Sequence, residues 1–421
     1  MKKDSVIYHS KKSKGAVVSF FGYLRDCVFF YFPFKRVPQW VRKGFYKRID
    51  YVFFIHPRRS EDWYLGLPFL SILRKFLKKE RMQKIVSKMP PVVVSSIESN
   101  RGRGVIMSSI ILPERVMGDR KNSVAHAVGA VKFSRRISEG QCVVGLGAWW
   151  PIVTRRGEAL RKAIADDNVI ITNGHTGTAI SMYMMIDKIS NISGLKLNEF
   201  KIAVIGAGKM GTNIARILNG KVAELAVVDI NEVNLRKIYD ELQNSQSRGG
   251  TKIVSFLRKG GESAYSLLDK YHLAICVTSN ARIVVKSDEL PDYFIMIDDS
   301  RPEAISRKMD LDKKLVLEGG IMKIIGAKTN YDYGFGVGQN VFGCLAETYA
   351  LSIDKGKTLK PSLGDVDLSN FRNMLGFYRD NGIEVGDFKS GDKLIENEKI
   401  REFIHRRNRV VREEGETDVS V

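Results

Sequence analysis

Three glycines and an aspartate form the part of the sequence whose spacing points most directly to chemistry. Gly206, Gly208 and Gly211 give the pattern G-x-G-x-x-G directly after the short apolar run 201–205. In such a turn the first glycine permits a sharp bend, the second lets the backbone approach a pyrophosphate, and the third lets the next helix pack on the strand. Asp229 ends the next apolar run, where a carboxylate can bind both ribose hydroxyls and repels a 2′-phosphate. The spacing predicts a dinucleotide site that favours NADH over NADPH.

The neighbours of these residues complete the expected cofactor site. Lys209 and Met210 open a helix predicted to run to about Asn219, whose N-terminal N–H groups and positive dipole end would face the phosphates. We also assign Thr278 to the site, as the last residue of a strand expected at 273–278. The competing interpretation is a glycine turn without a nucleotide. The order strand, turn, helix, strand and acid favours the cofactor.

The elements that must position this site alternate between strands and helices. We expect an α/β fold in which a Rossmann dinucleotide-binding domain is inserted after an N-terminal α/β substrate domain, and C-terminal helices return to the first domain. The expected parts are a basic aromatic arm (1–54), an α/β substrate and catalytic domain (55–195), a Rossmann NAD(P)-binding domain (196–330), a returning helical segment (331–390) and a charged, peripheral C-terminal tail (391–421).

Composition places the positive charge at one end of the chain. The formal net charge is +21 over 421 residues, and most of it comes from the first 90 residues. The segment 16–54 interleaves aromatic and basic residues, which suits an anionic membrane surface, although the aromatics could instead pack on the main body. Nucleic acid is the least favoured partner. Arg25 and Asp26 interrupt the apolar run, so it does not read as a transmembrane helix.

The four cysteines are isolated from one another in the sequence. No pair has the spacing of a metal site, so we expect a reducing compartment, no disulfide framework and no metal. The chain is therefore expected in the cytoplasm, where membrane contact by the basic arm would place it on the inner face of the membrane. The oligomeric state stays open.

Several segments together resemble the long-chain acyl-(acyl-carrier-protein) reductases that make fatty aldehydes in cyanobacteria. The resemblance covers roughly residues 50–385 in collinear order. Its segments are Ile111–Glu114, the glycine turn Val144–Trp149, Thr172–Thr176, the glycine turn at 206–211, Ile297–Asp298, Val316–Gly320 and Phe342–Glu347, with the pattern F-x-C-x-A-E, which is the most specific.

The resemblance implies reduction of an acyl thioester, carried by acyl-carrier protein or coenzyme A, to an aldehyde with NADH or NADPH. Cys344 would be the acyl-accepting nucleophile, although a cysteine on the apolar face of the helix expected at 338–353 could also be a buried hydrophobe. Cys344 would lie several residues into that helix and so need a basic neighbour. His175, at a helix start, is the candidate, and local packing is the alternative.

A second glycine turn precedes this candidate base in the sequence. Gly145 and Gly147 follow a strand expected at 142–146, and Trp149 could wall an acyl pocket or simply pack. Asn173 and Thr176 could cap the helix that starts near His175 or bind the nicotinamide amide. We therefore assign these five residues to the substrate pocket.

The family pattern is not matched at every position. Reductases of this family carry a basic or neutral residue where this chain has Asp229, and Ser300–Glu303 replaces their Gly-Tyr-Pro-Lys run. The fold also resembles shikimate dehydrogenase, amino-acid dehydrogenases and glutamyl-tRNA reductase, whose nucleophilic cysteine is N-terminal, where Cys27 lacks a comparable setting. A non-catalytic NAD-binding regulator with a basic arm is a third interpretation.

Overall fold

The chain folds into two compact units in the computed structural model. The first unit comprises Met1–Thr178 and Met322–Glu384, and the second comprises Ala179–Ile321 and Val385–Val421. The structure describes residues 15–32, 37–245, 250–257, 266–278, 285–300, 303–305, 309–329, 339–391 and 393–417. Segment 322–384 belongs to the first unit, which confirms the expected return of the chain after the nucleotide-binding part.

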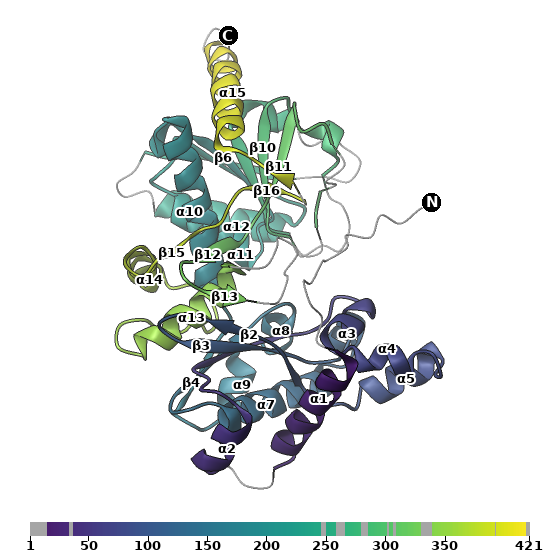
Figure 1. Cartoon of the computed structure of the whole chain (residues 1–421). Helices are drawn as coiled ribbons and strands as arrows, with labels where there is room; N and C mark the ends of the chain where they lie inside the picture. The colour runs from purple at the N-terminus through teal and green to yellow at the C-terminus, as the bar shows by residue number, and fades with distance from the viewer. Residues whose placement is uncertain are drawn as a thin grey trace. The chain divides into compact units, whose positions relative to one another are not determined.

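The second unit is built on a parallel sheet with the strand order β11-β10-β9-β6-β7-β8 (Figure 1). If these six strands are numbered 1 to 6 in chain order and the sheet is read from β8 to β11, the strand order is 3-2-1-4-5-6, which is the arrangement of a Rossmann fold. The inner strands are short apolar runs because both faces of a parallel sheet are covered, whereas the edge strand β8 is partly exposed. The strands are β6 (Lys201–Ile205), β7 (Glu224–Asp229), β8 (Lys252–Leu257), β9 (Leu273–Cys276), β10 (Phe294–Asp298) and β11 (Lys314–Glu318).

Helices of the second unit cover this sheet, and most were expected from the sequence. They are α10 (His175–Ser193), which begins in the first unit, α11 (Lys209–Leu218), α12 (Glu232–Asn244), α15 (Asn397–Thr417) and the short turns η1 (Leu197–Glu199), η2 (Ser266–Lys270) and η3 (Ser287–Glu289); the small strands are β16 (Lys389–Ser390) and β17 (Lys393–Leu394).

The C-terminal helix α15 is not the peripheral tail that was expected for 391–421. Ile400, Phe403 and Ile404 are buried in the core of the second unit. Arg407 is also buried, and its guanidinium donates to the carbonyl oxygens of Tyr271 and Leu268, both at 2.8 Å. A charged sequence can therefore form a core helix when its apolar residues share one face and its buried cation is hydrogen-bonded to backbone carbonyls.

The first unit has a mixed sheet with the order β13-β2-β3-β1-β4-β5, in which β1, β3, β4 and β5 are parallel. Strand β1 lies inside this sheet, so the end of the expected arm 1–54 is core: Tyr51 to Phe54 are buried. The strands are β1 (Tyr51–Ile55), β2 (Val92–Glu98), β3 (Arg103–Ser108), β4 (Cys142–Leu146), β5 (Val169–Thr172) and β13 (Lys328–Thr329); a smaller sheet joins β14 (Asn340–Phe342), β12 (Ile321–Ile324) and β15 (Ile383–Val385).

The helices of the first unit are short and numerous. Residues 61–86 contain three separate helices, and Pro68 precedes the second. The helix that follows Arg155 begins only at Glu158, because Arg155 and Gly157 have positive φ angles that a helix cannot contain. The helices are α1 (Ala16–Phe30), α2 (Gln39–Phe45), α3 (Glu61–Gly66), α4 (Phe69–Leu73), α5 (Lys79–Val86), α6 (Pro113–Gly118), α7 (Arg120–Ile137), α8 (Trp150–Val153), α9 (Glu158–Ala163), α13 (Gly343–Asp354) and α14 (Leu368–Asp380).

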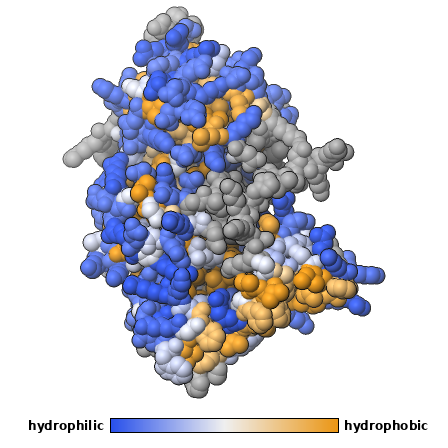
Figure 2. All heavy atoms as spheres, in the orientation of Figure 1, coloured by the Kyte–Doolittle hydropathy of each residue, from blue (hydrophilic) through white to orange (hydrophobic). Residues whose placement is uncertain are grey.

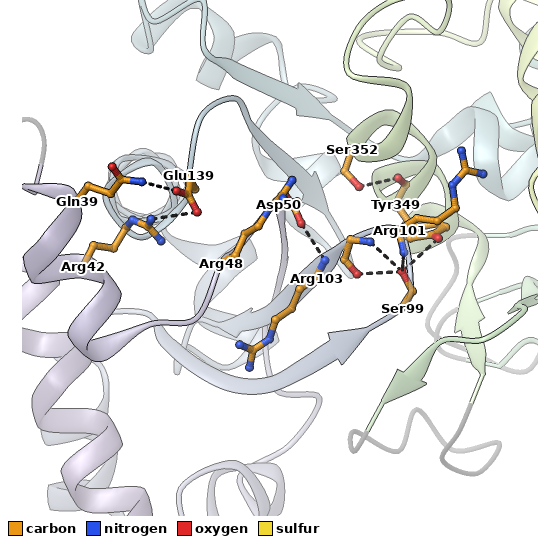
Figure 3. Close-up of polar contacts among 11 residues, drawn as sticks. Gln39, Arg42, Arg48, Asp50, Ser99, Arg101, Arg103, Glu139, Tyr349 and Ser352 are labelled. Carbon is orange, nitrogen blue, oxygen red and sulfur yellow. Dashed lines mark hydrogen bonds and ion pairs between the residues drawn. The ribbon is translucent and has the colours of Figure 1, made fainter.

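Polar contacts tie α13 to the β2–β3 hairpin (Figure 3). The Ser99 hydroxyl donates to the carbonyl of Gly102 at 2.9 Å and lies 3.3 Å from the hydroxyl of Tyr349, which is on α13. Asp50 accepts from the backbone N–H of Arg103 at 2.9 Å. Helix α13 also packs on β4 and β1. The helix that carries Cys344 is therefore fixed to the first sheet.

Candidate functional site

The thiol-bearing residue Cys344 lies directly against the turn that starts α10. Gly174 has a φ of +73°, and a methyl group there would lie 2.2 Å from Cβ and 2.6 Å from Cα of Cys344. Such distances exclude any side chain, so glycine is required at 174 both by its conformation and by the close approach. The structure thus brings Cys344 next to the residue that precedes His175.

A second glycine lets the two helices α10 and α13 cross. A methyl group at Gly177 would lie 2.2 Å from the carbonyl oxygen of Gly343 and 2.7 Å from Cβ of Glu347. Gly174, Gly177, Gly343 and Cys344 form what we call the glycine crossing. It joins the first turns of two helices from distant parts of the sequence, all within the first unit.

Cys344 is the second residue of α13, not several residues into the helix as expected. The reason is local: Asn340–Phe342 form the strand β14, so the helix begins at Gly343, and Gly338 lies outside the described residues. No side chain described in the structure caps α13, and its first turn contains no acidic residue. The positive end of the helix dipole, which acts within the first turn, therefore falls on Cys344.

Glu347 is fully buried one turn after Cys344 and binds the start of α10. One carboxylate oxygen accepts from the backbone N–H of Gly177 at 2.7 Å, and the other from the N–H of Ser362 at 3.0 Å and from the Thr172 hydroxyl. Burial raises the pKa of Glu347, and these hydrogen bonds oppose the rise. Glu347 thus occupies the position of a cap for α10, supplied by another helix.

His175 is the first residue of α10 and is half-buried. Burial first, and then the charge of Arg156, lowers the pKa of the imidazole to about 4. Its ring hydrogen-bonds the backbone of Gly364, while Nδ1 is buried without a partner among the described residues. The side chain is therefore neutral near pH 7, with one ring nitrogen left as an acceptor.

Asn173 and Thr176 are both committed to hydrogen bonds inside the first unit. Asn173 Oδ1 accepts from the N–H of His175 at 2.9 Å, which is the capping role, and its Nδ2 donates to the carbonyls of Arg156 and Gly364. The Thr176 hydroxyl lies 2.6 Å from Oγ of Ser362. These side chains hold the turn in place.

The glycines at 145 and 147 have a packing reason as well. A methyl group at Gly145 would lie 1.8 Å from Oγ1 of Thr348 on α13, and one at Gly147 would lie 2.6 Å from the Phe53 ring. Trp149 is half-buried, and its backbone N–H donates to Nε2 of His56 at 3.1 Å. The second glycine turn therefore serves first to seat α13 on β4.

One residue near Cys344 carried no sequence signal. Tyr378 on α14 is fully buried, and its hydroxyl has no hydrogen-bond partner in the described part of the chain. Burial, followed by the charges of Glu347 and Cys344, raises the pKa of Tyr378 well above its ordinary value of 10.0. The returning segment therefore supplies a buried, protonated hydroxyl whose pKa responds to both groups.

The glycine turn of the second unit has the geometry of a nucleotide cradle. Gly206 has a φ of +106°, and a methyl group at Gly211 would lie 1.7 Å from the carbonyl oxygen of Gly206. At Gly208 no described atom lies within 4 Å of such a methyl group, so the backbone there faces open space. Lys209 begins α11 as expected, and Met210 follows it. The turn is tight where the helix must pack and open where a pyrophosphate would approach.

Asp229 and Thr278 both lie beside this turn. One carboxylate oxygen of Asp229 accepts from the N–H of Ala207, and the other from the N–H of Asn231 at 2.7 Å. The backbone nitrogen of Thr278 would lie 3.4 Å from a methyl group at Gly206. The residues present therefore fit a dinucleotide, with Gly206, Gly208 and the start of α11 for the phosphates and Asp229 for the ribose.

Comparison with known proteins agrees with this geometry in the second unit. Residues 201–259 match the family model described as 3-hydroxyacyl-CoA dehydrogenase, NAD binding domain. No curated protein matches the sequence at a significant level.

Several solved structures are distantly similar. The chain is 20% identical to Δ1-pyrroline-2-carboxylate reductase from Thermococcus litoralis over 34% of this chain, with a TM-score of 0.25, and spans 42% of that protein. It is 17% identical to the nucleotide-binding domain of glutamyl-tRNA reductase from Thermoplasma volcanium (33% of this chain, 84% of that chain, TM-score 0.25). It is 11% identical to shikimate 5-dehydrogenase from Listeria monocytogenes (78% and 99%, TM-score 0.31). These low scores carry no argument about activity.

The family match and the open glycine turn together assign the cofactor class. The second unit is a Rossmann NAD(P)-binding domain, and the class of protein that this match supports is an NAD(P)-dependent oxidoreductase.

Proposed function

We propose that this protein reduces an acyl thioester to an aldehyde, with Cys344 as the acyl-accepting nucleophile. The observation that carries the proposal is the position of Cys344 in the first turn of α13, packed against Gly174, the residue that precedes His175. It lies in the segment Phe342–Glu347, which resembles the cysteine motif of the acyl-(acyl-carrier-protein) reductases. Acyl-carrier protein or coenzyme A would carry the acyl group.

The start of α13 favours the reactive form of the thiol. A thiolate is stabilised by the N-terminal dipole of a helix, and the first turn of α13 has no acid among its described residues to offset it. His175 supplies a neutral ring nitrogen that can take up the thiol proton. Because the pKa of His175 is only about 4, the imidazole is a weak base, and the helix must provide most of the stabilisation.

Acylation exchanges one thioester for another. The Cys344 sulfur attacks the acyl carbonyl carbon, a carbon–sulfur bond to Cys344 forms, the bond to the carrier sulfur breaks, and the carrier leaves as a thiol after gaining the proton lost by Cys344. Tyr378, which stays protonated because burial raises its pKa, would donate a hydrogen bond rather than a proton in this step. Glu347 holds α13 against α10 and so keeps the sulfur in place.

When bound at the glycine turn of the second unit, NAD(P)H would supply the hydride that reduces the acyl group on Cys344. Collapse of the hemithioacetal anion would break its carbon–sulfur bond and release the aldehyde, and the Cys344 thiolate would take up a proton to restore the thiol. Gly206, Gly208, Lys209, Met210 and Gly211 would hold the phosphates. Asp229 would accept from the ribose hydroxyls, and its negative charge favours NADH because it repels a 2′-phosphate.

Aldehyde formation by matched cysteine variants tests the proposal. Full-length protein is given NADH or NADPH with acyl-coenzyme A and acyl-carrier-protein substrates of several chain lengths, and aldehyde is quantified. Cys344→Ser should abolish the product and keep cofactor binding. Cys27→Ser is the control, since Cys27 is the other partly exposed cysteine among the described residues. Aldehyde formation that survives Cys344→Ser would refute the proposal.

The same variants separate the competing interpretations. A shikimate- or amino-acid-dehydrogenase-like reaction needs no thiol, so it would survive loss of Cys344. A glutamyl-tRNA-reductase-like reaction would need an N-terminal cysteine, and burial raises the pKa of Cys27, which disfavours its thiolate. A regulator would bind cofactor and form no product with any thioester.

A further inference from the structure

Helix α1 turns its apolar side chains toward solvent. Each of its residues that is exposed is apolar, and the exposed fractions of Val17 and Phe21 are 68% and 64%. Two of its three buried residues, Ser19 and Asp26, are polar. A helix on the surface of a water-soluble domain shows the opposite arrangement. The exposed residues are Val17, Val18, Phe20, Phe21, Leu24 and Val28.

Buried hydrogen bonds fix this orientation of α1. Asp26 accepts from the Tyr46 hydroxyl at 2.6 Å, from the backbone N–H of Val93 at 2.7 Å and from the guanidinium of Arg25 at 2.7 Å. Phe29 packs edge-on against Tyr46, with ring centroids 5.0 Å apart. Rotating the apolar side inward would leave the Asp26 carboxylate and its partners unpaired, which is costly inside a protein.

The apolar surface continues onto the neighbouring helix α4. Phe20 of α1 contacts Phe69 of α4, with ring centroids 5.5 Å apart. Ile72 on α4 and Phe76 in the turn after α4 are also exposed, with exposed fractions of 50% and 80%. In Figure 2 the hydrophobic spheres gather over α1 and α4, at the lower right of the view. We call the six exposed residues of α1 together with Ile72 and Phe76 the apolar face.

Cations predominate next to this face. Between residues 58 and 88 eight arginines and lysines have exposed side chains, against the exposed acids Glu61 and Glu80, within the side chains that the structure describes. The cations are Arg58, Arg59, Arg74, Lys75, Lys78, Arg81, Lys84 and Lys88. An anionic surface complements this charge, whereas a second copy of the chain would bring two cationic segments together.

From these observations we propose that the apolar face docks on an anionic membrane surface. Its side chains enter the boundary between headgroups and acyl chains, and the cations of 58–88 contact the anionic headgroups. No helix in the described parts of the chain has the length and hydrophobicity to cross a bilayer. This surface differs from the whole arm 1–54, because Phe29, Tyr46 and Phe53 are buried and only one side of α1 takes part.

Vesicle co-flotation of the full-length protein tests the proposal without using activity. The probes are vesicles of phosphatidylcholine alone and of phosphatidylcholine with phosphatidylglycerol, at low and high salt. We expect binding to the anionic vesicles, weakened by salt. The double variant Phe21→Glu with Val28→Glu should bind at least about tenfold less, since both apolar contacts are lost and two like charges are added. Both side chains are exposed, so unchanged thermal unfolding would show that the fold is intact.

Two matched variants decide the outcome. Ile230→Glu with Val233→Glu adds the same charges at exposed apolar residues of the second unit, 69% and 77% exposed, and should bind as wild type does. Lys75→Glu with Lys78→Glu should weaken binding to anionic vesicles only. Equal loss in the control, equal binding to neutral vesicles, or a dimer that Phe21→Glu with Val28→Glu dissociates while vesicle binding persists would overturn the membrane assignment.

Discussion

The glycine crossing of the first unit and the glycine turn of the second unit both bring backbone close to a helix start, and they use the space differently. At Gly174 and Gly177 a methyl group would meet Cys344, Gly343 and Glu347, so the site is filled by the protein itself. At Gly208 the same methyl group would meet no described atom within 4 Å. The first arrangement fixes a side chain, and the second leaves room for a ligand.

The largest effect is expected from a methyl group at the crossing. Gly177→Ala places Cβ 2.2 Å from the carbonyl oxygen of Gly343, which requires α10 and α13 to separate. We expect the free energy of unfolding to fall by about 3 kcal/mol, as for severe overpacking. Urea denaturation measures the change.

The matched variant at the nucleotide turn should behave in the opposite way. Gly208→Ala should change the free energy of unfolding by less than about 0.5 kcal/mol, because nothing described lies in its way. It should weaken NADH binding at least about tenfold, since the methyl group enters the space for the pyrophosphate. Equal destabilisation by both variants, with unchanged NADH affinity, would contradict the comparison.

The next effect concerns the buried carboxylate under the crossing. Glu347→Gln replaces one acceptor with a donor that faces the N–H groups of Gly177 or Ser362, and should lower the free energy of unfolding by about 2 kcal/mol at pH 4.5. Burial raises the folded-state pKa of Glu347 above its ordinary 4.5, so the folded protein holds this proton more tightly than the unfolded chain does. The stability that the folded protein gains from this tighter proton binding is fully present below pH 4.5, and it is lost as the pH rises through the folded-state pKa of Glu347.

The difference in free energy of unfolding between wild type and Glu347→Gln should therefore become smaller as the pH rises. Chemical denaturation at several pH values measures it, with Glu384→Gln, an exposed position on β15, as the control. A gap that does not change with pH would mean that Glu347 titrates as an ordinary carboxyl.

Cofactor choice should respond to a single charge. Asp229→Asn keeps a side chain that can accept from Ala207 and removes the negative charge, so the preference for NADH over NADPH should fall by about tenfold. Fluorescence titration with both nucleotides gives the ratio. An unchanged ratio, or a wild type that prefers NADPH, would show that Asp229 does not face the ribose.

The smallest expected effect is that of His175. His175→Ala should slow acylation of Cys344 by about tenfold, less than for a strong general base. Because the pKa is lowered to about 4, the wild-type imidazole stays neutral and no histidine break should appear near pH 6.5; the rate should decline only as pH approaches 4. Stopped-flow acylation over pH measures this. A break in the acylation rate near pH 6.5 that disappears in His175→Ala would show instead that His175 behaves as an ordinary, exposed histidine.

The difference between the two regions also explains what could be predicted from the sequence. The glycine turn, α11 and Asp229 lie within one continuous segment of about 30 residues, so local patterns reveal the cofactor site. The glycine crossing joins Gly174 to Cys344, which are separated in the sequence by most of the nucleotide-binding unit. Its motif could be recognised, but neither the packing of Gly174 on Cys344 nor the role of Glu347 follows from local spacing.

Other features that were not predicted correctly from the sequence also have physical causes. Strand β14 moved the start of α13, because three residues pair with β12 instead of continuing the helix. Helix α15 was expected to be peripheral from its charge, although Ile400, Phe403, Ile404 and Arg407 have the spacing of one buried face. Tyr378 carried no signal, since its burial beside Cys344 depends on the fold of the returning segment.

The most direct test of the central claim is intact-mass spectrometry of the protein incubated with acyl thioesters without NAD(P)H. The account predicts one acyl group per chain, present in wild type and in Cys27→Ser, absent in Cys344→Ser, and removed when NADH is added. No adduct with any thioester in a protein that binds NADH, or an adduct that persists in Cys344→Ser, would contradict it.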